Sequence, residues 1–80
     1  MFYVGYLEER NGEYLYKHTM CFVAEDPVMY LDTMASQFYD EAGGEQEGEG
    51  YYFYGGDIFV TPGKFMEVSE EVYTSLCTII

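Results

Sequence analysis

The sequence predicts a small α+β domain with the element order ββαββα, in which two helices pack on an antiparallel sheet of about four strands. Two observations carry this prediction. An Asn-Gly pair and a Gly-Gly pair each separate two runs rich in Tyr, Phe and Val, as expected for two hairpins. After each hairpin comes a segment with a helix-start signal and apolar residues at helical spacing. Eighty residues allow a single domain over 1–80.

Residues 2–9 and 13–24 are predicted to form the first two strands, with Asn11-Gly12 as a type I′ turn. This turn pairs Arg10 with Glu13 and sets the register of the remaining pairs. Leu7 then faces Tyr16. The strand face that carries Leu7 is the more core-like one, yet the opposite face is also apolar at its far end. We therefore expect both faces of the sheet to be covered, by helices or by another chain.

The next segment is predicted to be a helix that starts at Asp26, which caps it, with Pro27 in its first turn. Gly43-Gly44 is expected to end it. The apolar stripe comprises Val28, Leu31, Ala35, Phe38 and Ala42, and Asp32 falls on the opposite, polar side.

Residues 43–50 contain only Gly, Glu and Gln, which predicts a mobile acidic loop. The second hairpin follows and turns at Gly55-Gly56, so that Phe53 pairs with Ile58, and Tyr51 with Val60. Pro62-Gly63 is expected to break the second strand, which leaves 64–67 as a short edge segment.

The last helix is predicted to begin after Ser69, a plausible N-cap, with Glu70 and Glu71 in its first turn near the positive end of the helix dipole. Val72, Leu76 and Ile79 form its expected buried stripe. Such a short helix is marginal in isolation and must dock on the sheet.

The charge balance is acidic, with fifteen Asp and Glu against three Lys and Arg and a formal net charge of −12. Direct binding to nucleic acid or to anionic membrane surfaces is therefore not expected. Acidity alone also serves solubility. Cys21 and Cys77 follow no metal-ligand spacing, and a disulfide between them is kept as an alternative to two free thiols. The N-terminus has no signal-peptide pattern, so we expect a reducing, cytoplasmic setting.

No motif for catalysis, a metal or another cofactor is found. His18 is the only histidine, and Cys21, three residues further along the strand, must point to the other face. Glu45, Glu47 and Glu49 lack the ligand pattern of a calcium loop. We therefore expect no enzyme and no cofactor.

We expect instead a small acidic protein-binding module that contacts a basic or nucleic-acid-binding partner protein, for example as an inhibitor or nucleic-acid mimic. The residues expected at such an interface are acidic or aromatic: Glu8, Glu9, Glu13, Tyr14, Glu45, Glu47, Glu49, Tyr51, Glu70 and Glu71. One alternative is a small-molecule site or small enzyme with an aromatic pocket near Tyr16, His18 and Tyr52. Another is a homodimer in which apolar sheet faces or edge strands pair.

Overall fold

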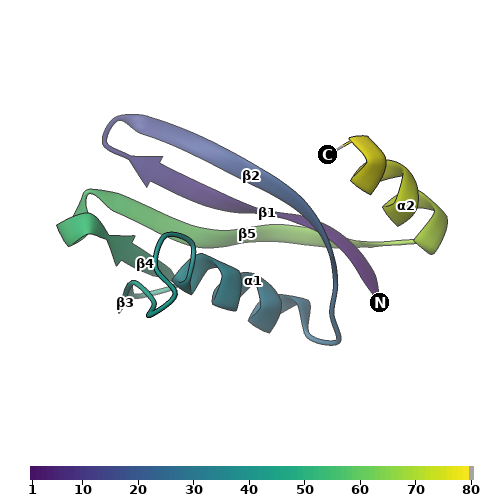
Figure 1. The fold of residues 1–80 in the computed structure, drawn as a ribbon, viewed down its shortest axis with the longest axis horizontal. Coiled ribbons are helices and arrows are strands. Elements are labelled where there is room, and N and C mark those ends of the chain that lie inside the picture. The colour runs from purple at the N-terminus through teal and green to yellow at the C-terminus, as the bar shows by residue number, and fades with distance from the viewer. Residues whose placement is uncertain (80) are drawn as a thin grey trace.

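The fold is an α+β arrangement of one five-stranded antiparallel sheet and two helices, as predicted (Figure 1). The computed structural model describes residues 1–79. The strands lie in the order β2-β1-β5-β4-β3. The elements are β1 (Phe2–Asn11), β2 (Tyr14–Val23), α1 (Pro27–Ser36), β3 (Glu45–Glu47), β4 (Gly50–Phe53), a short 3-10 turn (Tyr54–Gly56), β5 (Ile58–Val68) and α2 (Glu70–Ile79).

The register of the first hairpin differs from the prediction by two residues. Asn11 pairs with Tyr14, which makes Gly12-Glu13 the turn, and Arg10 faces Leu15 instead of Glu13. Of the two turn residues only Gly12 has a positive φ, of 62°, as in a type II′ turn. The physical reason is that Asn11 also pairs with Ile58 of β5 and is held in the strand.

A shift of two residues leaves every side chain on its predicted face, because side chains alternate along a strand. Tyr3, Gly5, Leu7 and Glu9 of β1 are buried, and this is the face predicted to be core-like. Leu7 faces His18 instead of Tyr16.

Strand β5 runs on through Pro62-Gly63, so the predicted break there is wrong. The pairing with β1 shifts between Gly5 and Leu7, which marks a β-bulge opposite Tyr6. A Cβ atom on Gly63 would lie 2.2 Å from Tyr6 Cε2, so only glycine fits at this point. Pairing between β4 and β5 involves only 58–60 of β5, so Pro62 stands where β5 has become an edge strand.

Helix α1 starts as predicted but is shorter. The Asp26 carboxylate accepts a hydrogen bond from the Met29 amide at 3.1 Å, and Pro27 opens the helix. The helix ends at Ser36, whose carbonyl accepts from the Gly44 amide at 2.7 Å. The predicted extension to Ala42 is wrong, because the chain turns after Ser36 and brings Phe38 and Tyr39 back against the sheet.

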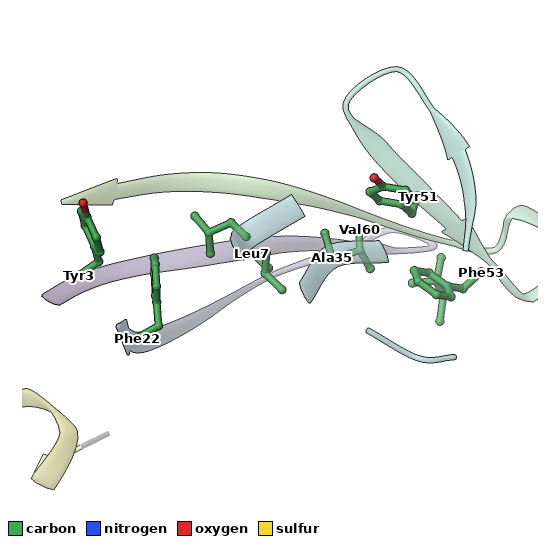
Figure 2. Packing of buried hydrophobic residues seen from close by; sticks show 9 residues of the cluster. Tyr3, Leu7, Phe22, Ala35, Tyr51, Phe53 and Val60 are labelled. Atoms are coloured by element: carbon green, nitrogen blue, oxygen red, sulfur yellow. The ribbon is translucent and has the colours of Figure 1, made fainter. Parts of the chain in front are cut away.

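The hydrophobic core lies between α1 and one face of the sheet (Figure 2). Of the predicted helix stripe, Leu31 and Ala35 are buried in it, whereas Val28 is 63% exposed. The full cluster comprises Tyr3, Leu7, Phe22, Leu31, Ala35, Tyr51, Phe53, Ile58 and Val60. The predicted pairs of the second hairpin, Phe53 with Ile58 and Tyr51 with Val60, are confirmed.

The acidic segment 43–50 is not a loop throughout. Its middle forms strand β3, in which Glu45 pairs with Tyr52 and Glu47 with Gly50. This three-residue strand is exposed along its length and forms one edge of the sheet.

Helix α2 docks on the sheet face opposite to α1, which fulfils the expectation that both faces need cover. Ser69 caps it, with its Oγ accepting from the Val72 amide at 3.2 Å. The Tyr73 ring packs on Phe2, with ring centroids 4.9 Å apart. Tyr73 and Leu76 are half-buried, but Val72 is exposed and does not belong to the packed stripe.

Candidate functional site

A groove of about 620 Å³ lies between α1, β5 and the turn that joins β3 to β4. This volume falls within the range of about 300–1,000 Å³ that is typical of ligand sites. The lining residues are Asp26, Val28, Met29, Leu31, Asp32, Gly48, Glu49, Pro62, Gly63 and Phe65. The groove therefore combines an apolar surface with three carboxylates.

Each of the three carboxylates comes from a different part of the fold. Asp26 stands at the start of α1, and Asp32 lies in its second turn. Glu49 reaches the groove from the β3–β4 turn. The Asp32 carboxylate accepts a hydrogen bond from the Tyr51 hydroxyl, at 2.9 and 3.0 Å to its two oxygens. This hydrogen bond, together with burial, raises the pKa of Tyr51, so the neutral phenol stays a donor that fixes Asp32.

No lysine or arginine lines the groove. All three cations of the chain belong to the opposite face of the sheet. Arg10 and Lys17 share that face with Tyr6 by their register, and Lys64 lines a hollow there with Val4 and Tyr6. The Lys17 ammonium lies 4.9 Å from the centre of the Tyr6 ring. The groove carboxylates are therefore not paired with a lysine or arginine in the lining of the groove.

The apolar part of the groove includes side chains that the fold leaves uncovered. Val28 is 63% and Met29 64% exposed, and Phe65 is 40% exposed. A methionine at such a surface adapts to ligands of different shape, because its side chain is unbranched and flexible.

A second polar cluster forms around Glu9, the only polar or charged residue buried in the described part of the chain. Its carboxylate binds His18 Nε2 at 2.7 Å and accepts a short hydrogen bond from the Tyr39 hydroxyl. Burial and the neighbouring Glu9 carboxylate raise the pKa of Tyr39 to about 12. The cluster therefore ties the segment after α1 to β1 and β2.

Neither Cys21 nor Tyr52 belongs to this cluster. His18 lies on the core face and Cys21 on the opposite face, as the sequence predicted. Tyr52 also lies on the opposite face, where its ring packs 4.5 Å from Phe59. The structure therefore does not bring Tyr52 and His18 into one aromatic pocket. Within residues 1–79 no group of three or more His, Cys, Asp or Glu side chains could hold a metal ion.

The residues predicted for a partner interface do not form one surface. Glu9 and Tyr51 are buried in the core, where each makes the hydrogen bonds described above. Glu8 is half-buried opposite Lys17. Glu13 and Tyr14 lie at the tip of the first hairpin, whereas Glu70 and Glu71 lie at the other end of the sheet (Figure 1). Glu45 and Glu47 lie along the β3 edge, and only Glu49 lines the groove.

Sequence reasoning missed Asp26 and Asp32 as site residues. Asp26 was recognised only as a helix cap, and Asp32 only as part of the polar side of the helix. The partner of Asp32, Tyr51, is 19 positions away. The sequence did carry a signal that Glu9 is buried, because the alternation of side chains along β1 places it on the same face as Leu7.

Comparison with models of protein families, with curated proteins and with solved structures found no match to this chain. In the described residues, no helix has both the length and the apolar character needed to cross a membrane.

Proposed function

We propose that this chain is a protein-binding module without catalytic activity, which takes up a basic, amphipathic segment of a partner protein in the groove between α1 and β5. The single observation that carries the proposal is the lining of the groove, where three carboxylates surround exposed apolar side chains and no cation is present. A lysine or arginine of the partner would meet Asp26, Asp32 or Glu49. Neighbouring apolar residues of the same segment would cover Val28, Met29 and Phe65.

Charge and apolar contact contribute differently to such binding. The negative charge of −12 accelerates the approach of a basic partner and gives the association a dependence on salt. The apolar surface supplies most of the affinity, because it leaves water on binding. A partner with charge alone would bind weakly, since exposed ion pairs contribute only about 0–1 kcal/mol each.

An inhibitor that mimics a nucleic acid is a more specific form of the same proposal. It requires carboxylates spread along an extended surface, in the way that phosphates follow a backbone. The predicted acidic residues do not form such a continuous surface: Glu13 lies at the hairpin tip, Glu70 at the start of α2, and only Glu49 lines the groove. This favours local binding in the groove instead.

The test is selection from a random peptide library displayed on phage, followed by binding measurements with one selected, fluorescein-labelled peptide. We expect selected peptides to combine Lys or Arg with apolar residues. The double variant Asp26→Asn, Glu49→Gln should raise the dissociation constant roughly 3- to 10-fold, because each exposed ion pair contributes up to about 1 kcal/mol. Asparagine still caps α1, so the fold should persist.

The matched control is Glu13→Gln with Glu41→Gln, which removes the same charge outside the groove. This control should bind the peptide like the natural sequence at physiological salt. Selected peptides without basic residues, or equal losses in the control and the groove variant, would contradict the proposal.

The second candidate function is that of a homodimer, in which the β2 edge strands of two copies pair. The observation that favours it is that β2 is a ten-residue edge strand without a single Asp or Glu, and its Tyr14 and Leu15 are largely exposed. A long, partly apolar edge strand is a template for pairing with a strand of another chain. Light scattering after size exclusion should give twice the monomer mass, and Leu15→Lys should restore the monomer. A monomer at all concentrations would rule this candidate out.

A further inference from the structure

The two cysteines of the chain, 56 positions apart in sequence, both lie where α2 docks on the sheet. The contact between Phe2 and Tyr73, with ring centroids 4.9 Å apart, fixes the side of α2 that faces the sheet. Cys77 follows Tyr73 by four residues, so both side chains lie on the same side of the helix.

The sheet presents Cys21 to this side of α2. Phe2 pairs with Val23 and Val4 pairs with Cys21, so Cys21 lies on the same face as Phe2, two residues along the sheet. Burial and the neighbouring Cys77 thiol raise the pKa of Cys21, and the Cys77 thiol also raises the pKa of Tyr73.

We propose that Cys21 and Cys77 are a redox-active dithiol, which a small-molecule disulfide such as oxidised glutathione converts to an intramolecular disulfide. Both cysteines are free in this structure, Cys77 exposed and Cys21 half-buried. The exposed Cys77 thiolate attacks oxidised glutathione, forms a mixed disulfide and releases one glutathione. The Cys21 thiolate then attacks the Cys77 sulfur and displaces the second glutathione. Two protons and two electrons leave the protein, and one disulfide of the oxidant is reduced to two thiols.

The new bond would fasten an element that is only weakly held in the fold. No described side chain of α2 is fully buried, and its packing relies on the half-buried Tyr73 and Leu76. A link between β2 and α2 would close a loop of more than fifty residues and suppress the opening of α2. The dithiol lies on the sheet face opposite to the groove, so this inference does not depend on the proposed function.

The experiment equilibrates the full chain with glutathione redox buffers, blocks remaining thiols with N-ethylmaleimide, and counts the blocked thiols by intact mass spectrometry. We expect the two thiols to disappear together, in a monomer that carries no glutathione. The same titration in concentrated urea supplies the reference without folded structure. Disulfide formation should be at least ~10-fold more favourable in the native chain than in urea, because folding holds the thiols together.

Cys77→Ser provides the variant test at an exposed position, with circular dichroism to verify folding, and Cys21→Ala repeats it from the other side. Each variant should form only mixed disulfides with glutathione. Hydrogen exchange of the α2 amides should slow severalfold on oxidation, while α1 stays unchanged. Mixed disulfides or intermolecular dimers as the main products of the natural sequence would overturn the proposal. Equal disulfide formation in native buffer and urea would also overturn it.

Discussion

Replacing Tyr39 with phenylalanine removes one hydroxyl group from the buried cluster around Glu9. The hydroxyl donates to a carboxylate that is only 3% exposed, and His18 is the other partner of this carboxylate. Phenylalanine keeps the ring and therefore its packing on Phe53 and Tyr54, at 5.5 and 5.6 Å. The substitution thus isolates the hydrogen bond.

The magnitude follows from the type of hydrogen bond. A hydrogen bond to a charged group contributes about 1.5–3 kcal/mol. We expect the lower end here, because Tyr39 is 39% exposed and water can approach the carboxylate when the hydroxyl is gone. A loss of about 1.5 kcal/mol corresponds to a decrease of roughly 1–1.5 M in the urea midpoint, since the urea dependence for small proteins begins near 1 kcal/mol/M.

Urea unfolding followed by far-ultraviolet circular dichroism measures this loss. Tyr14→Phe is the matched control, because it makes the same chemical change at a side chain that is 68% exposed at the hairpin tip. The control should stay within about 0.5 kcal/mol of the natural sequence. If Tyr39→Phe were no less stable than Tyr14→Phe, the view of Glu9 as a structural anchor would be refuted.

Three further outcomes are expected. Gly63→Ala should lower stability by about 1–3 kcal/mol in thermal unfolding, because the new methyl group overlaps the Tyr6 ring at the bulge. Leu31→Ala should cost about 2.7–5 kcal/mol, since Leu31 is 1% exposed, and the resulting loss of helical signal at 37 °C is visible by circular dichroism. Alkaline titration should reveal tyrosines that ionise late, because the pKa values of Tyr39, Tyr51 and Tyr73 are raised. The pKa of Tyr39 is raised from 10.0 to about 12 in the folded chain, so its contribution to stability is complete below pH 10 and is lost between pH 10 and about 12. The ultraviolet absorbance of phenolate should record this late ionisation, and Tyr39→Phe should remove one tyrosine from it.

Local turn signals predicted the second hairpin correctly and the first one only in part. The turn at Gly55-Gly56 yields all three observed pairs between β4 and β5, although the same residues of β5 also pair with β1 on their other side. At the first hairpin the neighbouring strand β5 holds Asn11 in the sheet and moves the turn by one residue. Pairing across distant segments decided this register, and a two-residue turn signal carries no information about it.

The candidate site was beyond the reach of sequence periodicity. The helical pattern placed Asp32 on the polar side of α1, which suggests solvent exposure. In the structure the hydroxyl of Tyr51, on β4, donates a hydrogen bond to this carboxylate. Glu49, in the β3–β4 turn, lines the same groove. A groove of this kind arises from the packing of three segments, and single-segment patterns record only the polarity of each one.

The distribution of charge along the two sheet edges bears on what the acidity of the chain does. Strand β3 is three residues long and carries Glu45 and Glu47, so both its length and its charge discourage pairing with another chain. Strand β2, at the other edge, has ten residues and no carboxylate. If the acidity served only to keep chains apart, the longer and more apolar edge would need the protection most. Three carboxylates, those of Asp26, Asp32 and Glu49, instead line the groove beside α1, where the proposed basic segment would meet them.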